Sequence, residues 1–89
     1  MTQTLTDLRL QIDEIDAGIL SLLDKRMKLA IEISRNKKTT QKAIFDPERE
    51  RELLSNLIGM NQETILPDEK VLEIWGKIIE ISKNTQNLG

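Results

Sequence analysis

The stretch Leu5–Lys37, LTDLRLQIDEIDAGILSLLDKRMKLAIEISRNK, decides the fold of this chain. Its apolar residues recur at steps of three and four, which is the spacing of one face of an α-helix. That face is formed by Leu8, Ile12, Ile15, Ile19, Leu22, Leu29 and Ile33. Arg26 interrupts the face, and Lys37 lies on it close to three turns later. Burying an unpaired guanidinium costs several kcal/mol, so a cation in an apolar seam implies an anion that meets it.

The apolar residues keep this spacing from Leu5 to Ile33, and the pattern predicts a long helix that continues to about Lys38. At about 1.5 Å per residue, its roughly 32 residues would form a rod about 48 Å long. Thr6 or Asp7 is expected to serve as its N-cap. Gly18 lowers the local helix propensity without ending so periodic a helix.

Two shorter helices are predicted after a loop over residues 38–43. Asp46 and Pro47 supply the N-cap and the first-turn proline of the second helix, which should end between residues 59 and 63. Pro67 and Asp68 open the third, which should run to about Thr85. The chain shows no competing strand pattern, so we expect an all-α fold with one long N-terminal helix and two shorter ones.

The helix lengths also predict a second copy of the chain. We expect residues 1–89 to form one domain, because so short a chain buries only a modest fraction of its surface. Helices of about 15 and 18 residues cover about 25 Å each and shield both ends of a 48 Å rod only if they line up end to end. The simplest cover is an intertwined homodimer in which the two long helices pack together.

Composition excludes several classes of function. The 89 residues include no cysteine and no histidine, which removes thiolate chemistry, the commonest metal ligand and the commonest general base. Phe45 and Trp75 are the only aromatic residues and the net charge is −2, so a nucleic-acid partner is not expected. No signal sequence or apolar run of transmembrane length is present. We therefore expect a cytoplasmic protein with no membrane partner, no metal and no cofactor.

Polar residues on the predicted helices could gather around one ligand. Arg26 and Lys37 would stand about 16 Å apart on one face, so their side chains could converge on a small molecule. Arg9 lies about 26 Å from Arg26, too far to touch that molecule from the same chain, and would have to serve another protomer's site. The remaining candidates are Asp46, Arg49 and Glu50 on the second helix, and Ser82 and Gln86 on the third.

Each of these residues has an ordinary explanation when taken singly. Arg26 could be solvated or paired with a nearby acid such as Asp24, and Asp46 could simply be an N-cap. Arg49 and Glu50 could belong to a solvated helix face, and polar residues near a chain end are often exposed. The argument for a shared site therefore depends on the candidates acting together.

Taken together, the spacing of these residues resembles the active-site pattern of the all-helical (AroQ-type) class of chorismate mutases. The resemblance spans nearly the whole chain and includes the local run Asp-Pro-Glu-Arg-Glu at residues 46–50. Its specificity lies in the order and spacing of eight positions: Arg9, Arg26, Lys37, Asp46, Arg49, Glu50, Ser82 and Gln86.

The resemblance implies an intertwined homodimer that rearranges chorismate to prephenate, toward phenylalanine and tyrosine. It implies that Arg26, and Arg9 from the other protomer, bind the two substrate carboxylates. Lys37 and Gln86 would hydrogen-bond the ether oxygen, and Glu50 with the Asp46 region would hold the ring hydroxyl. Arg49 and Ser82 would complete the site. By this resemblance the catalytic groups are Lys37, Gln86, Arg26 and Glu50.

Two alternatives stay open from the sequence. An isochorismate pyruvate-lyase of the same fold would use a similar set of cations, although the lyases of this kind carry an apolar residue where this chain has Glu50. A non-catalytic helical dimerisation module would need only the apolar seam and the acidic surface. In that case Arg26→Leu should stabilise the dimer without loss of function.

Overall fold

The computed structural model describes residues 2–36 and 46–86 of the chain. These residues form three α-helices and one short 3₁₀ turn, and no strand occurs among them. The all-α fold predicted from the sequence is confirmed. The predicted loop at residues 38–43 lies outside the described residues.

Helix α1 spans Leu5–Asn36 and has 32 residues. Its N-cap is Thr4, so the prediction of Thr6 or Asp7 is wrong. The Thr4 Oγ1 atom accepts a hydrogen bond from the Asp7 amide at 3.1 Å, and the Asp7 carboxylate accepts one from the Thr4 amide at 3.2 Å. This reciprocal pair satisfies two amides at the helix start, and it places Asp7 in the first turn rather than at the cap.

Helix α3 spans Pro47–Met60 and is followed by the 3₁₀ turn η1 at Asn61–Glu63. As predicted, Asp46 is the N-cap, because its side chain accepts a hydrogen bond from the Arg49 amide at 3.1 Å. Proline at the first helical position loses no hydrogen bond, since that amide has no partner within the helix.

The connection from α3 to α4 is organised around the side chain of Asn61, which is only 6% exposed. Its Nδ2 atom donates to the Leu66 carbonyl and to Asp68 Oδ1, both at 2.8 Å. The Thr64 hydroxyl donates to Asn61 Oδ1. Helix α4 then spans Asp68–Gln86, close to the predicted range.

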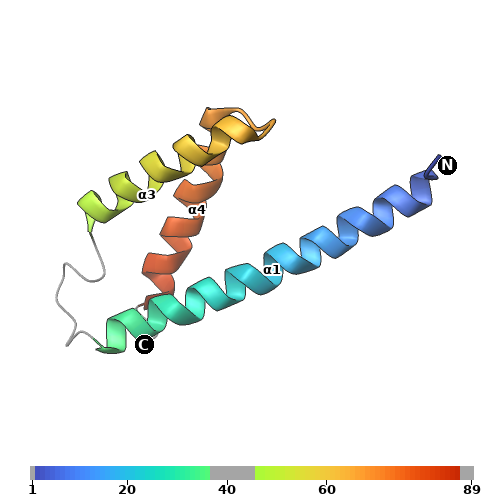
Figure 1. Cartoon of the computed structure of the whole chain (residues 1–89). Helices are drawn as coiled ribbons and strands as arrows, with labels where there is room; N and C mark the ends of the chain where they lie inside the picture. The colour runs from blue at the N-terminus through green and yellow to red at the C-terminus, as the bar shows by residue number, and fades with distance from the viewer. Residues whose placement is uncertain (1, 37–45, 87–89) are drawn as a thin grey trace.

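The arrangement of the helices leaves half of α1 without a neighbour. Figure 1 shows α4 reaching the C-terminal half of α1 and α3 packing on α4, while the N-terminal half of α1 projects away from both. Helix α4 contacts both α1 and α3. The elongated shape, with principal extents of 56 × 26 × 15 Å, follows from this projecting rod.

A single chain builds almost no hydrophobic core. Among the described residues, the buried hydrophobic side chains are Ala30 and Val71, and no large side chain is fully buried. The predicted apolar face of α1 is exposed instead: Ile15 is 62% exposed, Leu22 66% and Leu29 59%. Within the described ranges, no helix combines the length and the apolar character needed to span a bilayer.

Candidate active site

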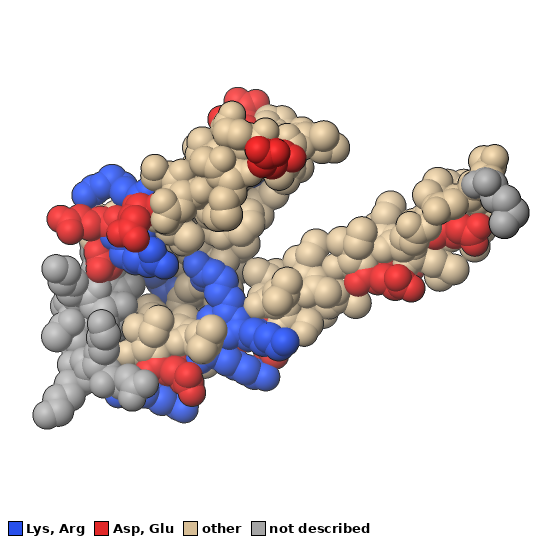
Figure 2. All heavy atoms as spheres, viewed as in Figure 1, with Lys and Arg blue, Asp and Glu red and all other residues tan. Residues whose placement is uncertain are grey.

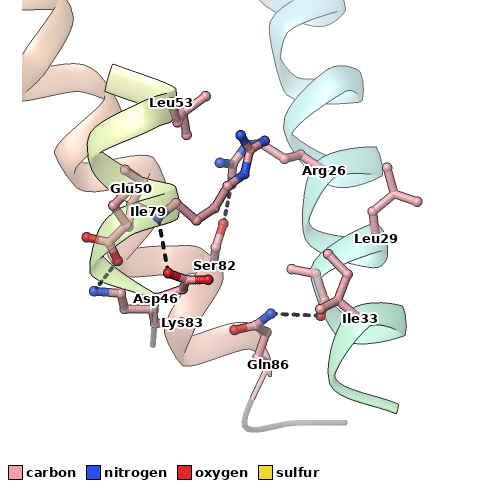
Figure 3. A pocket seen from close by; sticks show the side chains of 12 residues that line it. Arg26, Leu29, Ile33, Asp46, Glu50, Leu53, Ile79, Ser82, Lys83 and Gln86 are labelled. Carbon is pink, nitrogen blue, oxygen red and sulfur yellow. Dashed lines mark hydrogen bonds and ion pairs between the residues drawn. The ribbon is translucent and has the colours of Figure 1, made fainter. Parts of the chain in front are cut away.

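A cavity of about 340 Å³ lies between the C-terminal half of α1, the N-terminal half of α3 and the C-terminal half of α4. Figure 3 shows the side chains that line it, which come from all three helices. Its polar lining consists of Arg26, Asp46, Arg49, Glu50, Ser82, Lys83 and Gln86. Its apolar lining consists of Leu29, Ala30, Ile33, Leu53 and Ile79.

Arg26 enters the cavity from α1 and is held by α4. One of its terminal nitrogens donates to the Ser82 hydroxyl, which in turn donates to the Met27 sulfur at 3.3 Å. A guanidinium carries five N–H donors, so this contact orients the group and leaves other donors for a ligand. Ser82 therefore acts on the site by positioning Arg26.

The electrostatics of the cavity favour an anion. Burial, and then the nearby positive charge of Arg49, lower the pKa of Arg26 below its ordinary value. Arginine nevertheless stays protonated at neutral pH, so two cations face the same space. Figure 2 shows basic side chains gathered where the C-terminal half of α1 meets α3 and α4. Arg49 is largely exposed and already pairs with Glu52 at 3.2 Å, so Arg26 is the guanidinium whose loss of hydration an anion in the cavity would offset.

Gln86 closes the end of the cavity near the C-terminus of α4. It is only 8% exposed, and its Nε2 atom donates to the Ala30 carbonyl at 3.1 Å. A carboxamide nitrogen carries two hydrogens. The contact with α1 fixes the side chain through one N–H, and the carboxamide nitrogen has a second N–H that this contact does not use.

The start of α3 brings two acidic side chains to the cavity, in two different roles. Asp46 caps the helix through the Arg49 amide, so one of its carboxylate oxygens already has a backbone donor. Glu50 lies one turn further along and forms an ion pair with Lys83 of α4, with 2.6 Å between Oε1 and Nζ. Asp46 thus fixes the helix start that carries Arg49 and Glu50.

Six of the eight residues predicted from the sequence line this one cavity: Arg26, Asp46, Arg49, Glu50, Ser82 and Gln86. Arg9 lies on the exposed, projecting half of α1 and does not line the cavity of its own chain. Lys37 lies outside the described residues, so its predicted place opposite the reacting oxygen stays a prediction.

The sequence analysis did not identify Lys83, or the apolar side chains such as Leu53 and Ile79, as part of the cavity lining. Ile79, Ser82, Lys83 and Gln86 follow each other at steps i, i+3, i+4 and i+7, so one face of α4 carries all four. That spacing could have identified Lys83, but its partner Glu50 lies 33 positions earlier on another helix. No group of three or more metal-ligating side chains occurs in the parts of the chain that the structure describes.

The fold and the cavity define a class: an all-helical chain whose long first helix and two following helices line one cavity with both basic and acidic side chains. Residues 8–87 match the sequence model of the family described as chorismate mutase type II. The chain belongs to that family.

Curated relatives agree with this assignment. The chain is 39% identical over 80 residues to a bifunctional chorismate mutase/prephenate dehydratase of Aquifex aeolicus, covering 86% of this chain and 22% of the relative. It is 34% identical over 79 residues to the protein of the same description from Escherichia coli strain K12, covering 89% and 20%. It is 30% identical over 87 residues to the T-protein of Enterobacter agglomerans, covering 98% and 23%.

The chain therefore spans about a fifth of the length of these relatives. No solved structure gives a significant match.

Proposed function

We propose that this chain catalyses the rearrangement of chorismate to prephenate. The observation that carries the proposal is the convergence of Arg26, Glu50 and Gln86 from three helices on one cavity of about 340 Å³. Ligand sites for small molecules commonly begin at about 300 Å³. The mixture of cations, one free amide N–H and a carboxylate suits a small dianion that also carries a hydroxyl group.

The reaction asks little of the protein beyond binding and electrostatics. A concerted [3,3] shift breaks a carbon–oxygen bond and forms a carbon–carbon bond in one step, without a nucleophile or a proton transfer. The barrier falls when the flexible enolpyruvyl side chain is held over the ring in a reactive conformer. It falls further when donors face the ether oxygen, on which negative charge develops.

Arg26, Glu50 and Gln86 would each bind a different group of the substrate. Arg26, oriented by Ser82, binds a substrate carboxylate with its remaining donors. Gln86, fixed by the Ala30 carbonyl, offers its second N–H to the ether oxygen. Glu50 accepts a hydrogen bond from the ring hydroxyl. Lys37 would be a second donor to the ether oxygen, and this role is a prediction from the family resemblance.

The direct test gives purified protein chorismate and isochorismate in separate reactions. We expect prephenate from chorismate, and neither salicylate nor pyruvate from isochorismate. Gln86→Ala should lower kcat about a hundred- to a thousandfold, which is the usual effect of removing one preorganised donor. Salicylate and pyruvate from isochorismate, without prephenate from chorismate, would show a pyruvate-lyase instead.

We further propose that the working form is a homodimer in which the long helices pack together. The exposed apolar face of α1 supports this, because Ile12, Ile15 and Ile19 are each at least half exposed in the single chain. Burying such a side chain contributes about 1.5 to 3 kcal/mol. A second copy of the chain would bury this face and supply the core that one chain lacks.

Charge favours antiparallel pairing of the two helices. Residues 5–20 of α1 carry four acids and one base, whereas residues 21–36 carry four bases and two acids. Antiparallel packing would place the acidic half of each helix beside the basic half of the other, which is the complementary arrangement. In such a dimer Arg9, which lies far from the cavity of its own chain, would lie near the cavity of the partner chain.

Mixed dimers test whether Arg9 acts in the partner's site. Arg9→Ala and Arg26→Leu chains should each be nearly inactive alone. Co-expressed, they form mixed dimers in which one site has both arginines, so random pairing should restore about a quarter of wild-type activity. If mixing restores nothing, Arg9 does not serve the partner's site.

A cytoplasmic location and a single domain over residues 1–89 stay predictions.

A further inference from the structure

The ion pair between Lys83 and Glu50 differs from the other ion pairs of the described chain. Those four join residues three or four positions apart on one helix, and their side chains are 57–73% exposed. Lys83 and Glu50 belong to α4 and α3, and their side chains are 32% and 29% exposed. Partial burial reduces screening by solvent and salt, so this pair holds its geometry better than a surface pair.

The pair lies in the wall of the cavity. Figure 3 shows Lys83 and Glu50 across the cavity from α1, which carries Arg26. Lys83 Nζ lies 2.6 Å from Glu50 Oε1. A carboxylate has two oxygens that each accept hydrogen bonds. With Oε1 held by the ammonium group, the orientation of the whole carboxylate is set, and Oε2 is the oxygen left for a hydroxyl donor.

Charge gives Lys83 a second effect on the same acid. Apart from Lys83, the described lining carries two cations, Arg26 and Arg49, and two anions, Asp46 and Glu50. A dianionic substrate entering such a lining would be repelled by Glu50. The ammonium of Lys83 offsets that repulsion and leaves the described lining with a net positive charge.

We propose that Lys83 is a positioning residue for Glu50, which it orients and neutralises so that the carboxylate binds the substrate hydroxyl. This inference rests on the proposed function, since it takes Glu50 as the group that meets the ring hydroxyl. The hydroxyl is not a reacting atom. Its contact with Glu50 is therefore present in both the ground state and the transition state, so losing it raises KM with little change in kcat.

The test compares Lys83→Met, which keeps length and removes charge, with Lys83→Arg, which keeps the charge. Lys83→Met should raise KM for chorismate about five- to twentyfold and leave kcat within about threefold of wild type. Lys83→Arg should recover most of this loss. The matched control is Lys77→Met, which removes an exposed pair with Glu80 on the same helix and should leave both constants unchanged.

A double-mutant cycle with Glu50→Gln separates positioning from a direct contact with substrate. If Lys83 acts through Glu50, then Lys83→Met should have less than about a threefold further effect in the Glu50→Gln background. Independent effects that multiply would overturn the proposal. Lys83→Met could instead lower the melting temperature more than Lys77→Met does and leave KM unchanged. In that case the ion pair only stabilises the fold, and the proposal is also overturned.

Calorimetry with prephenate distinguishes failure of this inference from failure of the proposed function. Prephenate carries the ring hydroxyl and two carboxylates, and its binding requires no turnover. Weaker prephenate binding by Lys83→Met supports the positioning role even if the wild-type chain fails to convert chorismate. Unchanged binding overturns the role even in an active enzyme, and a wild-type chain that neither converts chorismate nor binds prephenate overturns both proposals.

Discussion

Replacing Arg26 by leucine should separate activity from stability. In the folded chain Arg26 donates to Ser82, and a single hydrogen bond to a charged group contributes about 1.5 to 3 kcal/mol. Burial and the nearby charge of Arg49 both disfavour the charged guanidinium, which is why they lower the pKa of Arg26. The leucine removes these two unfavourable effects, and this gain opposes the loss of the hydrogen bond. The opposing terms are of similar size, so we expect the free energy of unfolding to change by no more than about 1 kcal/mol.

The effect on activity should be far larger. Truncating one partner of a desolvated, hydrogen-bonded charge pair costs about 2 to 5 kcal/mol. At about 1.36 kcal/mol per tenfold change in rate, kcat/KM for chorismate should fall about 30- to 5,000-fold. Ser82 is not orphaned by the change, since its hydroxyl still donates to the Met27 sulfur.

Two measurements on the same samples check this prediction: the rate of chorismate consumption and the urea dependence of helical circular dichroism. Arg26→Lys keeps the charge without the planar fork of donors, so it should retain intermediate activity. The matched control is Lys28→Leu, which removes an exposed cation that pairs with Asp24 at 2.8 Å on the same helix and should keep near-normal activity.

The carboxylate-binding role of Arg26 is refuted if Arg26→Leu retains activity within about threefold of wild type. A dimer that becomes more stable at the same time would favour the non-catalytic dimerisation module. Loss of activity together with extensive unfolding would show that the arginine acts through the fold.

Three further predictions follow from the cavity, the α3–α4 connection and the exposed face of α1. Wild-type kcat should change little around neutral pH. The kcat of Gln86→Glu should rise as the pH falls toward the ordinary glutamate pKa of about 4.3, since only a protonated carboxyl donates a hydrogen bond. If Gln86→Glu is as active as wild type at every pH, Gln86 does not donate to the ether oxygen. Asn61→Ala should lower the free energy of unfolding by about 2 to 3 kcal/mol in urea, because two donated hydrogen bonds are lost and the Leu66 carbonyl loses its partner; a change below about 1 kcal/mol would contradict this. Ile15→Asp should weaken the dimer at least about tenfold by analytical ultracentrifugation, and unchanged association would place the interface elsewhere.

Local signals in the sequence determined the helices. The apolar spacing of α1 and the Asp46-Pro47 start of α3 depend on residues a few positions apart, so both could be predicted. The start of α1 was misplaced because several neighbouring residues could cap it. Only the backbone geometry shows that Thr4 and Asp7 exchange hydrogen bonds.

The sequence also showed that the apolar face of α1 carries a cation, and the spacing of its polar residues predicted six residues that line one cavity. The tertiary structure decided what holds them: Ser82 against Arg26, the Ala30 carbonyl against Gln86, and Lys83 against Glu50. These partners lie 56, 56 and 33 positions apart. Helical periodicity fixes which residues share a face, but the packing of one helix on another decides which faces meet.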